Sequence, residues 1–423
     1  MIKYLKKILN NENYKRIIEN IVSLFSLQGL TYILPLITFP YLTRVLGPDK
    51  YGQIAFAAAF ITYFQTFTDY GFNLSATREV SLNRDNDDKI SEIFSSIFIV
   101  KIILMTISLI IMTIIVFSFD IFRSNWILYY FTFGILIGRD LLLTNWLFQG
   151  MEKMRYITIL NIGTSIIYTL SIFVFVKESS DYLYVPLINS FGSLIIGLVS
   201  LRLINKEFNV KFIRPTLDDI IHQFKEGFHL YISTLGSSLY LTSTRFILGL
   251  FVSDAVLGYY TVAETLTSAF KGLISPISQA IYPYISRLQS ENPIKAKKDL
   301  KKILIVMGTL TFILSIVVAL CAPILIKLLA GENYAQSIPI LQILIFTVFA
   351  VGINNVLGIQ GLVAFGYKEK FSKIIVFAGI FNVIILVGLI ILLGSIGAAI
   401  AVVTTEFLIC IIEYIILRRV KIL

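Results

Sequence analysis

Twelve long apolar segments, separated by short polar or turn-forming stretches, dominate the chain. Each approaches or exceeds the roughly 20 apolar residues that a helix needs to cross a membrane. Several end at turn residues, such as Gly47-Pro48-Asp49 and Gly394-Ser395. The pattern predicts an all-α, polytopic membrane protein with spanning helices at 18–42, 53–75, 94–117, 126–148, 156–176, 182–204, 228–251, 257–284, 304–326, 337–362, 373–393 and 396–417.

Composition agrees with this pattern and excludes several functional classes. Only 15% of the residues are charged, against about 25% in soluble proteins. The two cysteines, Cys321 and Cys410, both lie in apolar runs, so neither a disulfide framework nor a cysteine-based metal site is expected. No phosphate-binding loop or hydrolase motif occurs. We therefore expect no catalytic residues, no metal site and no cofactor.

The positive charges predict an orientation. With the N-terminus inside, 27 of the 36 lysines and arginines fall in cytoplasmic segments and five in external loops. This excess follows the positive-inside rule, and it places both termini in the cytoplasm. The net charge of +10 is thereby assigned to a membrane surface, and no nucleic-acid partner is expected.

The longest hydrophilic segment, 205–227, divides the chain into two halves of six spans. Within it, Thr216 is placed to cap a helix whose first turn carries Asp218 and Asp219. The apolar positions that follow share one face, which predicts a short amphipathic helix on the inner membrane surface. The predicted domains are thus 1–204, the linker 205–227, and 228–423. Weak matches between the halves suggest a duplication, as in many transporters, although chance similarity of apolar segments is the alternative.

Four basic residues fall within predicted spans, where a charge is costly and usually faces a cavity or a partner. Arg139 and Lys271 lie near mid-span, roughly 15 Å from the nearer helix end, and are predicted to face a water-filled interior. Arg245 and Lys101 lie closer to an end, so extension of their side chains to the interface is an alternative. All four are candidate substrate-binding cations.

Two predicted spans also carry polar stripes. Each stripe falls on one helical face and would line a hydrated cavity, whereas hydrogen bonding between helices is the alternative for the hydroxyl groups. The candidates are Thr62, Gln65, Asp69 and Asn73 in the second span, and Glu264, Ser268, Lys271, Ser275 and Ser278 in the eighth.

Carboxylates within spans are candidates for coupling to an ion gradient. Glu406 in the last span is one, and Asp69 and Glu264 are others; whether Na⁺ or H⁺ would be the ion stays open. Glu413 lies in the same span, and for it an interfacial ion pair with Arg418 is the alternative. Asp140 cannot share a face with its neighbour Arg139, so its partner is expected on another helix.

Several motifs resemble one family. The segments 41–47 (YLTRVLG), 69–78 (DYGFNLSATR) and 146–154 (WLFQGMEKM) resemble Wzx-type oligosaccharide flippases of the multidrug/oligosaccharidyl-lipid/polysaccharide exporter superfamily. The resemblance implies two six-helix lobes around a central cavity lined by cations. It also implies a substrate, a polyprenyl-diphosphate-linked oligosaccharide that crosses from the inner to the outer leaflet of the bacterial cytoplasmic membrane by alternating access. Such transport serves surface polysaccharide synthesis, O-antigen and lipopolysaccharide included, and a polysaccharide polymerase is an expected partner.

Two other functions stay open on the sequence. A drug or cation antiporter of the same fold would favour acidic groups in its cavity, and the cations Arg139, Arg245 and Lys271 argue against it. A membrane polysaccharide polymerase or ligase would be expected to present a sizeable external catalytic loop, and the predicted external loops are short.

Overall fold

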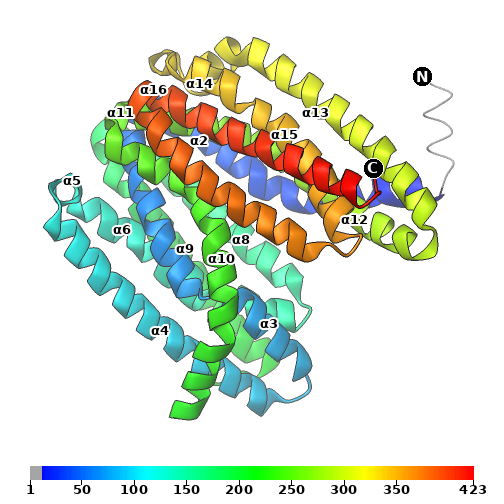
Figure 1. Cartoon of the computed structure of the whole chain (residues 1–423). Helices are drawn as coiled ribbons and strands as arrows, with labels where there is room; N and C mark the ends of the chain where they lie inside the picture. The colour runs from blue at the N-terminus through cyan, green and yellow to red at the C-terminus, as the bar shows by residue number, and fades with distance from the viewer. Residues whose placement is uncertain (1–11) are drawn as a thin grey trace. The chain divides into compact units, whose positions relative to one another are not determined.

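The computed structural model describes residues 12–423, with side chains from residue 37 onward except at 229, 230 and 232–242. Residues 1–11, the start of the predicted first domain, lie outside the described residues. Throughout the described range the secondary structure is helical and contains no strand, as Figure 1 shows. The predicted all-α class is confirmed.

Contacts divide the chain into two compact units. The N-terminal unit is Leu34–Phe246, and the C-terminal unit combines Ile247–Leu423 with the part of α2 before Leu34. The elements up to Phe251 are α2 (Glu12–Asp69), α3 (Phe72–Leu82), α4 (Asp87–Ser118), α5 (Asp120–Arg123), α6 (Trp126–Leu136), η1 (Ile137–Leu142), α7 (Asn145–Gly150), α8 (Met154–Phe175), η2 (Ser179–Leu183), α9 (Tyr184–Phe208) and α10 (Leu217–Phe251). The elements after it are α11 (Asp254–Gly272), α12 (Ile274–Glu291), α13 (Pro293–Leu329), η3 (Glu332–Tyr334), α14 (Ser337–Leu344), α15 (Phe346–Asn354), η4 (Asn355–Val363) and α16 (Lys368–Arg419).

Within the described residues, seven helical segments are long and apolar enough to cross a membrane. One of them, α16, contains two predicted spans, because its backbone departs from helical geometry at Gly394 (φ 57°, ψ −132°). Likewise α2 runs through Gly47 (φ 71°, ψ 172°), between the first two predicted spans. The protein is therefore a multi-pass membrane protein, while the count of twelve spans and their orientation stay predictions.

The fourth and tenth predicted spans share an unusual feature. Each contains a π-helical segment, η1 in the fourth and η4 in the tenth. Such segments are rare and occur often at functional sites. Because both interrupt the same span of a six-span half, they support the predicted duplication.

The eighth predicted span is interrupted at one residue, Leu273, whose backbone angles stay right-handed helical (φ −69°, ψ −21°). α11 ends at Gly272, and α12, which contains Pro276, begins at Ile274. A proline ring clashes with the carbonyl group four residues earlier, which here is that of Gly272. The disruption therefore appears before the proline.

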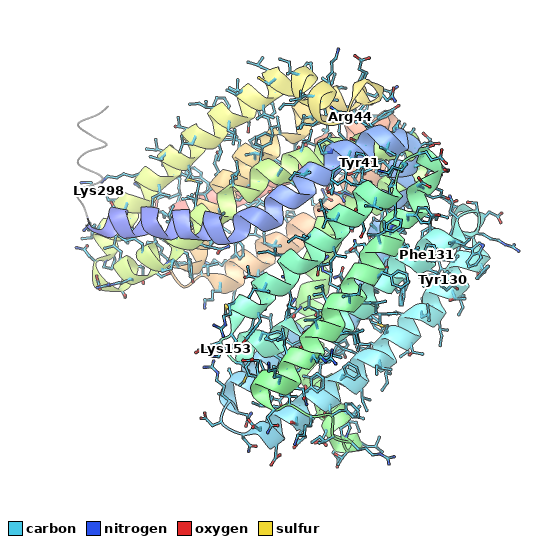
Figure 2. All side chains as sticks on the ribbon, turned by 180° about the vertical axis from the view of Figure 1, so that it is seen from behind. Tyr41, Arg44, Tyr130, Phe131, Lys153 and Lys298 are labelled. Carbon is cyan, nitrogen blue, oxygen red and sulfur yellow. The ribbon has the colours of Figure 1, made fainter. Side chains whose placement is uncertain are left out.

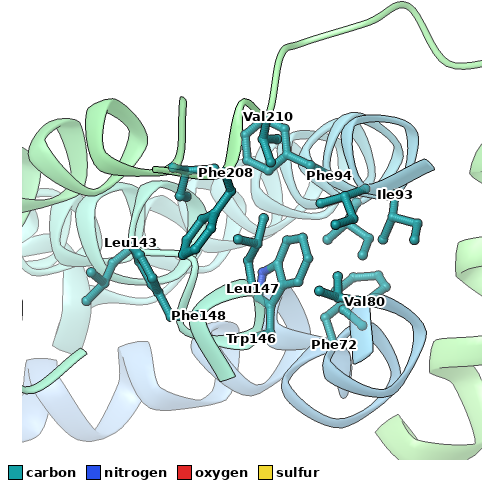
Figure 3. Packing of buried hydrophobic residues seen from close by; sticks show 14 of the residues in the cluster. Phe72, Val80, Ile93, Phe94, Leu143, Trp146, Leu147, Phe148, Phe208 and Val210 are labelled. Carbon is teal, nitrogen blue, oxygen red and sulfur yellow. The ribbon is translucent and has the colours of Figure 1, made fainter. Parts of the chain in front are cut away.

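The segments 69–78 and 146–154, which carry the family resemblance, pack against each other. Phe72 and Val80 of α3 lie in one buried cluster with Trp146 and Phe148 of α7, as Figure 3 shows. The Thr77 hydroxyl donates to the carbonyl oxygen of Trp146 at 3.2 Å. The two motifs therefore hold α3 against the C-terminal end of the fourth predicted span.

The predicted linker helix begins as expected. α10 starts at Leu217, and the Thr216 hydroxyl accepts from the Asp219 amide at 3.2 Å. In return, the Thr216 hydroxyl and amide donate to the Asp219 carboxylate at 2.6 and 2.9 Å. These bonds form a capping box, and they hold the pKa of Asp219 below its ordinary value.

The linker helix is not a separate short element, because α10 continues to Phe251. Ile220 and Phe224 pack against the core of the N-terminal unit, and Gln223, which is 2% exposed, donates to Glu79 at 2.8 Å. The non-helical stretch before α10 is held too, since the Lys211 amide donates to the Ser91 hydroxyl at 3.1 Å. The linker is therefore anchored to the N-terminal unit.

Candidate functional site

Lys101 is the centre of a polar cluster within the N-terminal unit. It lies on α4 and is only 4% exposed. Its ammonium group donates to the carbonyl oxygen of Asp140 at 2.8 Å and lies 3.9 Å from the Asp69 carboxylate. The Phe72 ring is 5.9 Å from the same nitrogen. Lys101 therefore does not extend to the membrane interface but is held by fixed partners.

Two carboxylates and two amides complete the cluster. The Asn73 amide donates to Asp69 at 2.7 Å, and the Gln65 amide donates to the Asp140 carboxylate at 3.3 Å. The predicted partner of Asp140 on another helix is confirmed, because Gln65 lies on α2. Helices α2, α3, α4 and η1 thus contribute to one network, which joins three of the predicted stripe residues to a predicted cation.

The cluster lies where the fourth predicted span is interrupted. Asp140 belongs to η1, and the helix stops before Leu143 and Thr144, which have non-helical backbone angles. Carbonyl groups in the last turn of a helix run out of backbone donors, and that end carries partial negative charge. The Lys101 ammonium group supplies the Asp140 carbonyl with a hydrogen-bond donor and places a positive charge at this negative helix end.

Several buried polar atoms at this interruption have no hydrogen-bond partner among the described residues. They are Asp140 Oδ2, Thr144 Oγ1, Asn145 Oδ1 and Trp146 Nε1. Buried polar atoms are normally paired, and irregular backbone at membrane depth is tolerated where it is buried or lines a water-filled cavity. Interrupted spans of this kind form the substrate and ion sites of many transporters.

The remaining predicted residues of the N-terminal unit lie outside the Lys101 network. Arg139 is exposed on η1, next to the buried network through Asp140. The Thr62 hydroxyl donates to the carbonyl oxygen of Ala58 in its own helix at 2.8 Å. Arg245 lies partly buried on α10. Arg139 is the one of these three residues that is exposed, and it lies on the interrupted span.

The stripe of the eighth predicted span belongs to the C-terminal unit, and the break at Leu273 divides it. Glu264, Ser268 and Lys271 lie on α11, while Ser275 and Ser278 lie on α12. Lys271 is partly buried in the last turn of α11. Ser278 is 8% exposed, and its hydroxyl accepts from the Gln360 amide of η4 at 2.8 Å. Ser278 therefore makes the interhelical bond that was the alternative to cavity lining.

The last predicted span carries two buried carboxylates. Glu406 is 8% exposed and accepts from the Asn354 amide at 2.9 Å. Glu413 is fully buried, and neither of its carboxylate oxygens has a hydrogen-bond partner among the described residues. The predicted interfacial ion pair between Glu413 and Arg418 is wrong, because the buried carboxylate has no partner among the residues that the structure describes.

Sequence reasoning missed the amides of the C-terminal unit. Asn354 and Gln360 flank or lie within η4, and both bond to another helix. Asn354 and Gln360 could have been found from the sequence, because they are polar residues inside a predicted apolar span. No group of three or more potential metal ligands occurs among the residues that the structure describes. The clusters are suited to holding charge and hydrogen-bonding a polar ligand.

Comparison with known sequences identifies relatives along the whole chain. The family model described as "Polysaccharide biosynthesis protein" matches residues 17–289. A protein of Escherichia coli (strain K12) named "Putative O-antigen transporter" is 33% identical over 98% of this chain and 99% of its own length. A protein of the same name from Shigella dysenteriae is 27% identical over 92% of this chain and 97% of its own length.

Solved structures share the fold. An inward-facing multidrug resistance MATE family transporter of the MOP superfamily superposes with a TM-score of 0.71 at 13% identity, covering 92% of this chain and 95% of that one. The lipid II flippase MurJ, in an inward closed conformation, gives a TM-score of 0.64 at 15% identity, covering 93% of this chain and 87% of that one. These likenesses show that the chain shares the polytopic helical fold of those two proteins.

Proposed function

The chain belongs to the polysaccharide biosynthesis protein family, and from this premise we propose that it is a flippase for lipid-linked oligosaccharides. The protein moves polyprenyl-diphosphate-linked repeat units from the inner to the outer leaflet, for the synthesis of an O-antigen-like surface polysaccharide. It is a transporter and not an enzyme. The observation that carries this proposal is the 33% sequence identity to a protein named "Putative O-antigen transporter" along nearly the full length of both chains.

The charges at the interrupted span fit such a substrate. A diphosphate resists entry into hydrocarbon, because an unpaired charge there is costly. Arg139, exposed on η1, supplies a guanidinium group that forms paired, charge-assisted hydrogen bonds with phosphate oxygens. Gln65 and Asn73 of the Lys101 network offer amides to sugar hydroxyls. We propose that Lys271 and Arg245 are further cations that bind this substrate.

Three finer features belong to the same proposal. The protein resides in the bacterial cytoplasmic membrane and passes its product to a polysaccharide polymerase. Turnover follows alternating access, with Na⁺ or H⁺ as the coupling ion. The carboxylates Asp69, Glu264 and Glu406 are the coupling candidates, and Glu406 is supported by its burial in a predicted span.

Deletion of the gene tests the function directly. In deletion cells, complete lipid-linked units are expected to accumulate on the inner face of the membrane while surface polysaccharide disappears. An impermeant sugar-modifying reagent, applied to right-side-out and inverted vesicles, measures which face exposes them. A plasmid copy of the gene is the control and should restore export. Absent or incomplete units would instead assign the chain to synthesis, and units exposed outside as in the parent would contradict the proposal.

Arg139→Gln combined with Lys271→Gln is expected to lower export at least tenfold while the protein stays folded. Each charge-assisted hydrogen bond contributes about 1.5–3 kcal/mol, and one decade in rate corresponds to about 1.4 kcal/mol. Export is measured in the deletion cells at equal protein levels. Lys153→Gln with Lys368→Gln, both exposed in predicted cytoplasmic turns, removes the same charge and should leave export unchanged. Full export by the first pair would remove these cations from the proposed site.

A further inference from the structure

One exposed face of α13 is basic near the start of the helix and apolar further along. Over its first three turns this face carries Lys295, Lys298, Lys301 and Lys302, all exposed. From Ile305 onward the same face is apolar, and Ile305, Leu320 and Ile324 are 68%, 76% and 68% exposed. At 100° per residue, the four lysines and the apolar residues that follow fall within one broad sector of the helix. Figure 2 marks Lys298 near the N-terminal end of α13.

The lengths of the two parts match the layers of a bilayer. From Ile305 to Leu328 the helix rises about 35 Å, enough to cross a hydrocarbon core of roughly 30 Å with some tilt. The lysine-bearing turns add roughly 10 Å more, which reaches through the headgroup layer. Charge distribution along the chain predicts that this end is cytoplasmic. The lysines therefore lie at the depth of the inner-leaflet phosphates.

The two ends of α13 differ in how their charges are balanced. At the far end, Lys327 pairs with Glu332 at 2.8 Å. At the near end, Lys302 is 3.5 Å from Asp299, but the structure records no carboxylate partner for Lys295, Lys298 or Lys301 among the residues it describes. Three unneutralised ammonium groups therefore continue directly from a lipid-facing apolar surface.

We propose that this lysine face, defined as Lys295, Lys298 and Lys301, binds the headgroups of anionic phospholipids in the inner leaflet. Headgroup phosphates supply the missing negative charge, while the acyl chains of the same lipids lie along the apolar face that begins at Ile305. A basic segment at the membrane surface attracts anionic lipids by this mechanism. The binding surface is separate from the Lys101 cluster and does not depend on what the protein transports.

Lipid retention by the purified full-length protein tests the proposal. The protein is equilibrated with equal amounts of phosphatidylglycerol and phosphatidylcholine in mixed micelles at low salt, washed, and its bound lipids are quantified by mass spectrometry. The native protein is expected to retain phosphatidylglycerol preferentially. In Lys295→Gln/Lys298→Gln/Lys301→Gln the preference should fall by about fivefold for each lysine, and salt should weaken the native preference.

A matched variant, Lys206→Gln/Lys211→Gln/Lys225→Gln, removes the same charge from exposed positions of the other unit and is expected to keep the native preference. An unchanged preference in the first variant would overturn the proposal, as would an equal loss in the second. Equal retention of both lipids by the native protein would overturn it too. Circular dichroism on all three proteins confirms that the helices are intact.

Discussion

Lys101→Met is expected to abolish export and to destabilise the protein by about 3–5 kcal/mol, the usual result of removing one member of a buried ion pair. The substitution keeps the length of an apolar stem but deletes the ammonium group that joins α4 to the Asp140 carbonyl and to Asp69. Two carboxylates then share a buried site without their cation. Export in deletion cells and thermal unfolding in detergent measure the two effects.

Lys89→Met is the control for that substitution. Lys89 lies on the same helix and pairs with Glu92, but the side chains are 41% and 33% exposed, so a loss of at most about 1 kcal/mol is expected. Adding Asp69→Asn to Lys101→Met should recover part of the lost stability, because it removes one uncompensated carboxylate. A Lys101→Met protein as stable as the native one would contradict the central role of this ammonium group.

The spanning helices were predictable because length and hydropathy alone decide whether a segment suits a bilayer. The breaks at Gly47 and Gly394 were predictable, because turn residues separate apolar runs there. The start of α10 was predictable because Thr216 can cap a helix. The sequence analysis predicted a short linker helix, although nothing in the residues around Glu226 and Gly227 stops a helix, and α10 continues to Phe251. Its apolar face was available equally to a membrane surface and to the protein core, and the structure uses the core.

The sequence predicted which polar residues of the site lie within spans, but not which side chains contact each other. Position along the chain placed Lys101 and Asp140 within predicted spans but left open whether Lys101 extends to the membrane interface. Which helices meet is a tertiary property that one sequence does not reveal. Glu413 shows the limit, because nearness to Arg418 in sequence suggested an ion pair while the helix turns the two side chains to different surroundings. The π-helical segments were also hidden, since no residue type marks an added helical residue in an apolar run.

Gly138→Ala is expected to destabilise the N-terminal unit by about 3 kcal/mol, at or beyond the usual upper range for overpacking, and to abolish export. A β-carbon at this position would lie 2.3 Å from the main-chain carbon of Ser193 and 2.5 Å from the amide nitrogen of Leu194. Main-chain atoms of α9 cannot turn aside as a flexible side chain does. η1 would therefore move away from α9 and carry Arg139 and Asp140 with it.

Gly192→Ala separates that effect from a general intolerance of larger residues on these helices. Gly192 lies on α9, and its added β-carbon would meet only Ile167 at 3.5 Å, an ordinary van der Waals contact. Alanine also favours a helix over glycine by about 1 kcal/mol, so stability should be unchanged or raised and export retained. If Gly138→Ala kept native stability but lost export, the close approach would matter for motion rather than for packing. If it kept both, the position of η1 against α9 would not control the site, because the Lys101–Asp140 contact would have survived a displaced helix.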